Sequence, residues 1–189
     1  RENARNAPAA TPPVELVTTQ RFGTAWVWPD ADSEPPLPID DSDGGCDCDA
    51  GDTPVDACVW TQQHPAIEIC DGDAVSECGG EVYNLLRSRG VKTVLICGVH
   101  LNMCVLGRGF AIRQLLRLGV RVRLLRDLTD TMYNPARPPH VDHFRGTELV
   151  VMHVERHCCP SVLSTDLTGE REPFSFRAST AFMRSGVGV

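Results

Sequence analysis

The chain has 189 residues, a net charge of −7 and 42% hydrophobic residues. This length suits a single domain with a buried core, and the acidic balance argues against nucleic acid or an anionic membrane surface as a partner. Nothing approaches the ~20 consecutive apolar residues of a membrane span, and no signal peptide is recognisable, so we expect a cytoplasmic protein without membrane contact.

The nine cysteines are a high and odd count, and no two of them form a CxxC pair. Extracellular disulfide scaffolds are usually shorter and carry their cysteines in loops, whereas Cys97 and Cys104 fall in strand-like and helix-like runs. We therefore expect reduced thiols. The close pairs at 46–48 and 158–159 lack the ligand spacing of zinc sites, so neither a metal nor another cofactor is expected.

Residues 1–52 are polar, proline-rich and acidic. Ten carboxylates and no lysine or arginine lie between Asp30 and Asp56. Because like charges repel and apolar groups are scarce, this composition predicts irregular structure or disorder. The run GTAWVW at 23–28 is an exception that can pair as a strand or anchor on a neighbouring element. The motif DDSDGGCD at 40–47 does not match a calcium-binding loop and predicts a solvated acidic loop.

Residues 53–166 carry regular hydrophobic patterns. In chain order these patterns predict a strand at 56–61, a helix at 76–90, a strand at 92–98, a helix at 104–119, a strand at 120–125, a turn-rich loop at 127–140 and a strand at 161–165. Ser76 is the expected cap of the first helix, and Gly90 is its expected end. The pattern at 146–159 leaves helix and strand open, and residues 167–189 predict a loose tail.

The alternation of strands and helices predicts right-handed βαβ units and a three-layer α/β/α sandwich with a mostly parallel sheet. The continuous apolar run at 92–98 predicts a strand that is buried on both faces. In such sheets the reactive groups gather at the carboxyl ends of the strands. The stretch CGVHLNMCV at 97–105 lies at one of those ends.

Cys104 is the candidate nucleophile. If the strand ends near Gly98, Cys104 begins the next helix, where unpaired backbone N–H groups and the helix dipole stabilise a thiolate. The same N–H groups can hold the oxyanion that forms when a thiolate attacks a carbonyl. The alternative is that Cys104 is a small buried residue, the commoner fate of a cysteine and the one expected for Cys97.

The stretch VLICGVHLNMCVLGRGFAIRQLLRLGVRVRLLRDLTDT at 94–131 resembles the isochorismatase-like cysteine hydrolases, which include nicotinamidases and N-carbamoylsarcosine amidases. The resemblance covers residues 76–165, with Leu101 in place of the usual threonine. The positions in step with the family signature are Gly98, Val99, Asn102, Cys104, Val105, Gly119, Val122 and Asp127. The motifs IDDSDGGCD, QHPAIEI, GVHLNMCVLGR and TDTMYNP resemble a branch that is common in planctomycete-type genomes.

The resemblance implies that Cys104 is the nucleophile and that the Val99–His100 peptide bond is cis. The backbone N–H groups of His100 and Cys104 would form the oxyanion hole, while the His100 side chain either fills the pocket wall or transfers a proton. The family fold is an α/β/α sandwich of Rossmann-type topology. The resemblance further implies a small-molecule substrate and a homo-oligomer.

Four further residues are candidates for substrate contact. Asn102 belongs to the signature, and Arg108, one turn after the cysteine, can reach a substrate carboxylate or form a surface or interface ion pair. Tyr133 and Asn134 come just past the carboxyl end of a strand, where lid residues occur. Asp127, by contrast, is expected to cap local backbone.

The family also uses an aspartate at the end of its first strand as general base, and a lysine upstream of the cysteine. No apolar strand ending in aspartate precedes the acidic stretch, and Lys92 lies at the wrong end of its strand. Where the lysine would fall, the chain has Gln63, His64 and Glu68 instead. We therefore expect that the first strand is missing here and that this segment alone is inactive or weakly active.

Two functions remain open. The first is a cysteine hydrolase that attacks a small amide or related C–N bond through a thioester intermediate. The second is a member whose catalytic residues have decayed, and which serves as a scaffold for ligand binding or oligomerisation. Replacement of Cys104 by alanine separates the two.

Overall fold

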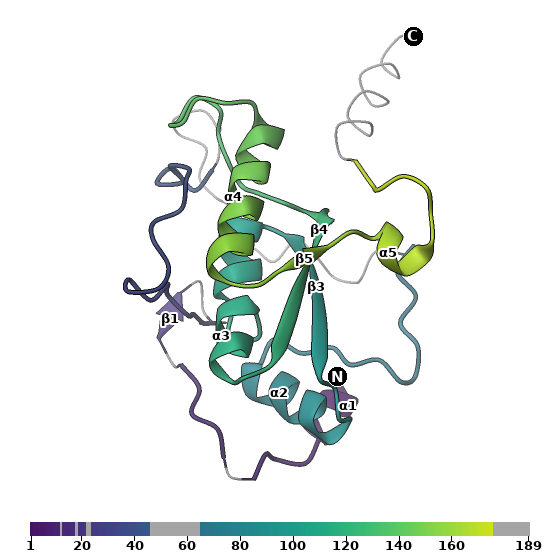
Figure 1. Cartoon of the computed structure of the whole chain (residues 1–189). Helices are drawn as coiled ribbons and strands as arrows, with labels where there is room; N and C mark the ends of the chain where they lie inside the picture. Colours follow the sequence, from purple (N-terminus) through teal and green to yellow (C-terminus); the bar gives the residue numbers. More distant parts are fainter. Residues whose placement is uncertain (12, 18, 22–23, 46–64, 176–189) are drawn as a thin grey trace.

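The computed structural model describes residues 1–11, 13–17, 19–21, 24–45 and 65–175, and the strand predicted at 56–61 lies outside these ranges. The parallel sheet at the centre of Figure 1 carries the candidate nucleophile's turn. In chain order the elements are α1 (Glu2–Arg5), β1 (Gln20–Arg21), β2 (Thr24–Ala25), α2 (Gly79–Ser88), β3 (Thr93–Val99), the π-helical turn η1 (Leu101–Val105), α3 (Ile112–Arg117), β4 (Arg121–Asp130), α4 (His143–His157), β5 (Ser161–Val162) and α5 (Thr165–Thr168).

Three strands form the sheet in the order β3–β4–β5, and all of them are parallel. The register of β3 on β4 is irregular, because Ile96 is opposite Leu124 whereas Gly98 is opposite Thr129. Right-handed crossovers through α3 and α4 place both helices on one face of such a sheet. Figure 1 shows α2, α3 and α4 together on that face. The predicted α/β fold with a parallel sheet is confirmed.

The hydrophobic core lies between these helices and the sheet. Most of its members come from η1, α3, β4 and α4, so the turn that carries Cys104 is itself anchored in the core. The most deeply buried apolar side chains are Leu101, Leu106, Ile112, Leu115, Leu124, Val150 and Val154. Each such side chain stabilises the fold by roughly 1.5–3 kcal/mol through burial.

Strand β3 is not buried on both faces, as its apolar run had predicted. Its residues alternate between half-buried and exposed, and Leu95 and Val99 are 41% and 55% exposed. Within the described part of the chain, β3 pairs only with β4 and its outer face has no covering helix. Val94 and Ile96 point to the helix side, where they pack against the core.

The helix predicted at 104–119 is interrupted. After η1 the chain stays helical through Gly107 and leaves the helical path at 108–111, and α3 begins only at Ile112. Gly107 and Gly109 weaken a helix, and their backbone pairs instead with the N-terminal segment. The Gly107 carbonyl accepts from Val27 N at 2.7 Å, and Gly109 N donates to the Ala25 carbonyl at 2.9 Å. Residues 25–27, within the run GTAWVW, are therefore the partner that ends this helix.

The structure also defines the ends of α2 and the start of α4 more closely than the sequence did. Helix α2 begins at Gly79 with Cys78 as N-cap, while Ser76 Oγ accepts from Cys78 N at 3.0 Å and bonds the Glu81 carboxylate. Gly90, with a φ of 63°, lies just past its end, as predicted. The region left open at 146–159 is helical, and the Asp142 carboxylate caps α4 by accepting from two backbone N–H groups.

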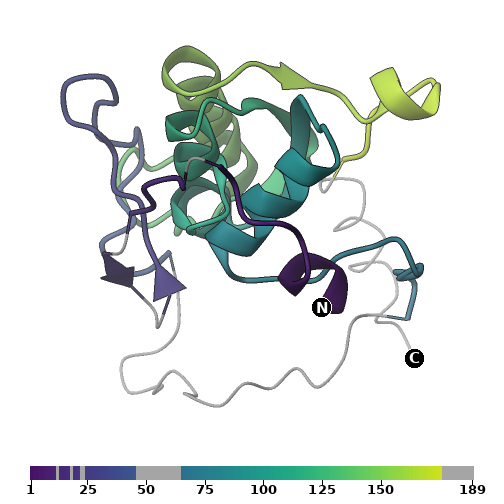
Figure 2. The same cartoon turned by 90° about the horizontal axis from the view of Figure 1, so that it is seen from below.

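The N-terminal acidic segment has little regular structure, but its described residues pack on the domain. Trp26, Val27 and Ile39 are buried, and α1 lies beside α2 (Figure 2). Glu34 is only 7% exposed and forms two hydrogen bonds with Arg113, at 2.8 and 2.5 Å. A carboxylate from the stretch predicted to be irregular or disordered is thus held inside the protein.

Candidate active site

The candidate site is built on the turn that follows β3. The Val99–His100 peptide bond is cis, at the position that the resemblance gives for such a bond. The His100 carbonyl accepts from the backbone N–H groups of Met103 and Val105, each at 3.1 Å. Cys104 is therefore the fourth residue of a π-helical turn rather than the first residue of an α-helix, as the sequence had predicted. Single π-turns of this kind are frequent at functional sites.

The Cys104 side chain lines a cavity of about 350 Å³ beside β3. The walls come from α2, from β3 and from the segment that leads into α3, and almost all of them are apolar. The larger apolar side chains in this lining include Val82, Leu86, Val94, Ile96, Phe110 and Leu115. Cys97 lines the same cavity and is exposed, so its predicted burial is wrong. A cavity of this size and polarity is typical of a small-molecule site.

Arg108 reaches the cysteine from the next turn. Its Nε donates a hydrogen bond to Cys104 Sγ at 3.5 Å. The sequence left a substrate contact and a surface ion pair open for Arg108; the structure places its side chain on the sulfur. The guanidinium is not among the groups that line the cavity, so it holds the sulfur from outside.

Asn102 does not face the cavity. It is buried, and its amide Nδ2 donates to Asp41 Oδ2 at 2.9 Å and to the Met132 carbonyl at 3.1 Å. Its Oδ1 accepts from Met132 N at 3.0 Å. Asn102 thus ties the cysteine turn to the acidic loop and to the loop after β4.

Tyr133 and Asn134 likewise serve the loop rather than the cavity. The buried Tyr133 hydroxyl donates to the Arg137 carbonyl at 2.8 Å, and Asn134 Nδ2 donates to Asp43 Oδ2 at 3.1 Å. Arg137 also forms ion pairs with Asp40 and Asp43. The acidic loop predicted to be solvated is therefore bonded to the loop after β4.

A second polar cluster, which the sequence reasoning missed, lies at the carboxyl end of β4. His143 Nε2 is 3.0 Å from both Asp130 oxygens, and its Nδ1 is 3.1 Å from the Tyr133 carbonyl. Thr147 donates to the same carboxylate. Burial opposes the charged imidazole, but these acceptors outweigh it and raise the pKa of His143. Asp130 is the sheet partner of Val99, so the cluster lies one strand from the cysteine turn. The only sequence signal was an aspartate at a strand end.

In the ranges that the structure describes, the aspartate and lysine expected from the resemblance are not bonded to the sulfur. Among the described residues, no carboxylate and no lysine is hydrogen-bonded to Cys104 Sγ. Asp127 accepts from the backbone N–H groups of Ser164 and Phe174, which is the capping role expected for it. Glu68 is exposed, Lys92 is exposed at the opposite end of β3, and Gln63 and His64 lie outside the described residues.

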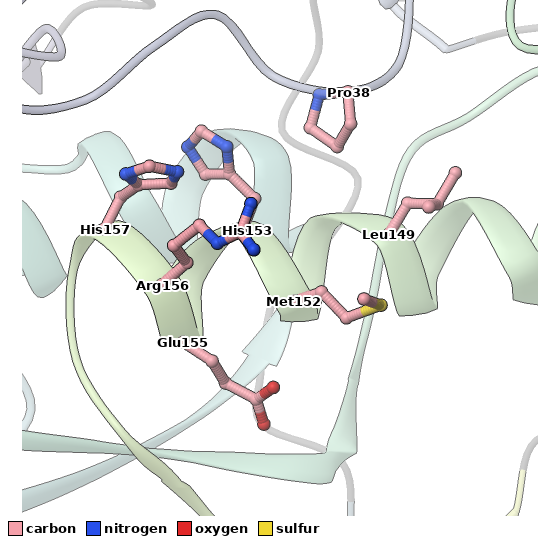
Figure 3. Close-up of a pocket in the computed structure, with 7 residues that line it drawn as sticks. All are labelled: Pro38, Leu149, Met152, His153, Glu155, Arg156 and His157. Carbon is pink, nitrogen blue, oxygen red and sulfur yellow. The ribbon is translucent and has the colours of Figure 1, made fainter.

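A further hollow lies elsewhere, along α4 (Figure 3). It measures about 490 Å³ and holds no cysteine. His153 and His157, one turn apart, contribute imidazoles to it, with ring centres 4.9 Å apart. His153 Nε2 lies 3.3 Å from the buried Glu34 carboxylate. Across the described ranges, no group of three His, Cys, Asp or Glu side chains is placed to hold a metal.

Comparisons with known proteins bear on one part of the chain. Residues 72–156 match the family model of the isochorismatase domain, a range that includes α2, β3, the cysteine turn, α3, β4 and nearly all of α4. Neither the curated proteins nor the solved structures contain a match to this chain. No helix in the described part of the chain has the length and apolar character needed to cross a membrane.

Proposed function

Because residues 72–156 belong to the isochorismatase-like superfamily, we infer that the chain is a hydrolase of that family. Its Cys104 is proposed to cleave a small amide or a related C–N bond. The observation that carries the proposal is the position of its thiol. Cys104 lines an apolar cavity at the carboxyl end of β3, and an arginine N–H donates to its sulfur. Sulfur acts as a nucleophile in the thiolate form, which such a donor favours.

The proposed reaction proceeds in two steps. The Cys104 thiolate forms a bond to the carbonyl carbon, the C–N bond breaks, and the nitrogen leaves with a proton taken from solvent. Water then attacks the thioester, which releases the carboxylic acid and returns the thiol. We assign the backbone N–H groups of His100 and Cys104 to the oxyanion of each tetrahedral intermediate.

The cavity walls favour one class of substrate. Because the lining is apolar and carries no charged side chain, the group that flanks the scissile carbonyl should be compact, apolar and uncharged. A cavity of about 350 Å³ accommodates a single small ring or a short branched chain. The substrate is therefore proposed to be a small molecule rather than a peptide or a polymer.

The proposal is tested by turnover of a panel of small neutral and charged amides by the wild-type protein, C104A and C158A. Cys158 is a matched control because burial raises the pKa of its thiol to about 12, which keeps it protonated and unreactive. We expect C104A to lose at least about 10³-fold in rate and C158A to keep it. Intact-mass detection of an acylated Cys104 would identify the intermediate.

The result also decides between the two functions left open by the sequence. Equal turnover in C104A and wild type would exclude Cys104 as the nucleophile. Absence of turnover by every protein in the panel, together with ligand binding that C104A retains, would favour the scaffold. That scaffold reading is supported by the lack of a carboxylate at the sulfur among the described residues.

A further inference from the structure

We infer that Arg108 is the cationic partner of the Cys104 thiolate and that the N-terminal residues 25–27 hold it in that position. The inference rests on the proposed function, because it requires Cys104 to work as a thiolate. It assigns to Arg108 a charge-pairing role in place of a substrate contact. The positive charge comes from the residue one helical turn after the nucleophile.

The contact has the chemistry of a charge-assisted hydrogen bond. Arg108 Nε lies 3.5 Å from Cys104 Sγ, a normal separation for a donor to sulfur. A guanidinium only donates and keeps its charge at every physiological pH. A thiol is a weak acceptor and a thiolate a strong one, so this donor stabilises the charged form more than the neutral form.

Among the described residues, no carboxylate pairs with the Arg108 guanidinium. Arg113, Arg126 and Arg137 are each paired with a carboxylate in this structure. Arg108, in the part of the chain that the structure describes, has no carboxylate partner, and its side chain bonds only to the cysteine sulfur. Its positive charge therefore remains available to a thiolate.

The backbone around Arg108 is fixed by a distant segment. Arg108 forms an antiparallel bridge with Trp26, and the flanking hydrogen bonds join Val27 to Gly107 and Gly109 to Ala25. Trp26 is 1% exposed and packs closely against Gly107, where an added Cβ would lie 2.4 Å from the indole Cε2. The bridge replaces the helical path at this point, so the direction of Arg108 depends on the N-terminal segment.

The test measures the reactivity of Cys104 without requiring turnover. Iodoacetamide labelling of the wild-type chain is followed at Cys104 by peptide mapping, at pH 7 and at pH 10. We expect R108Q to slow labelling at pH 7 about tenfold and to approach the wild-type rate at pH 10, where the thiolate forms without help. R108K, which keeps the charge, should lie closer to wild type than to R108Q. R117Q, which removes an exposed arginine from α3, should match wild type.

A second variant tests the clamp. G107A forces the Trp26 ring away from the bridge and should slow labelling in the same direction as R108Q, although Arg108 is still present. Circular dichroism melts show whether each variant is folded. If G107A is folded and labels at the wild-type rate, the N-terminal segment does not position Arg108.

The outcomes separate this inference from the proposed function. If Cys104 labels rapidly in wild type and equally rapidly in R108Q at pH 7, the role of Arg108 is excluded while the nucleophile stands. If R108K is as slow as R108Q, charge pairing is excluded as the cause. If Cys104 in wild type labels no faster than the half-buried Cys158, both the inference and the proposed nucleophile are excluded.

Discussion

Arg108 and Arg113 lie five residues apart, and the structure uses them in opposite ways. Arg113 is 9% exposed and is neutralised by Glu34, which also contacts His153. Arg108 is half-buried and bonds only to the Cys104 sulfur, within the described residues. The same residue type thus serves the fold at one position and a reactive atom at the other. What separates them is whether a carboxylate from the N-terminal segment reaches the guanidinium.

The largest predicted effect is on the Glu34–Arg113 pair. E34Q leaves the Arg113 charge buried without a counter-ion, and loss of one partner of a buried pair costs about 3–5 kcal/mol of unfolding free energy. Urea unfolding measures this loss. The matched control is E148Q, which breaks the exposed pair between Arg145 and Glu148 and should cost about 0–1 kcal/mol. Equal losses in the two variants would show that the buried pair does not hold the N-terminal segment.

The same pair predicts a response to acid. Burial raises the pKa of Glu34, but the hydrogen bonds from Arg113 and His153 outweigh it and lower the pKa to about 2. A carboxyl with a depressed folded-state pKa contributes stability above its unfolded value, and this contribution is lost as the pH falls. The stability difference between wild type and E34Q should therefore shrink between pH 4.5 and pH 2. A difference that stays constant over that window would contradict an ionised Glu34.

An intermediate effect is expected at His143, whose bonds to Asp130 and Tyr133 are half-exposed. Its pKa is raised, so its stabilising contribution is complete below the unfolded value of 6.5 and is lost as the pH rises through the folded value. Because solvent screens the pair, H143Q should destabilise the protein by only about 1 kcal/mol at pH 5.5, and by less at pH 9, where the charged imidazole is depleted. Thermal melts at both pH values measure this. A larger loss of stability at pH 9 than at pH 5.5 would contradict a raised pKa of His143.

The smallest predicted stability change is that of R108Q. Because the guanidinium is half-exposed and has no carboxylate partner among the described residues, its removal should change the unfolding free energy by less than about 0.5 kcal/mol. Urea unfolding of R108Q and E34Q in parallel measures the difference. We expect the Glu34–Arg113 pair to control stability and the Arg108–Cys104 pair to control thiol reactivity. If R108Q loses as much unfolding free energy as E34Q, both arginines serve mainly to stabilise the fold.

The local periodicity of the sequence was enough to predict much of the domain. Apolar spacing indicated α2, β3 and β4, and the glycines at 90 and 119 marked helix ends, because these signals depend on neighbouring residues. The turn after β3 was identified from its own residues. The exposed face of β3 was not, because a continuous apolar run does not reveal which neighbours cover it.

The fates of the polar residues depended on distant contacts. The structure bonds Asn102, Tyr133 and Asn134 to Met132, the Arg137 carbonyl and the acidic loop, while their contact with substrate stays a prediction. The helix after Cys104 stops because a distant segment, residues 25–27, pairs with the backbone of Gly107 and Gly109. Nothing in the run CVLGRGFAIR by itself indicates that partner.

The sequence by itself determined the α/β pattern and delivered Cys104 to the carboxyl end of a parallel strand, because periodicity and turn chemistry act over a few residues. Only the tertiary structure decided which arginine faces a carboxylate and which faces the thiol. It also decided that Glu34 is buried and that the apolar cavity opens beside Cys104. Burial and charge pairing are set by groups far apart in the chain, so a local pattern carries no record of them.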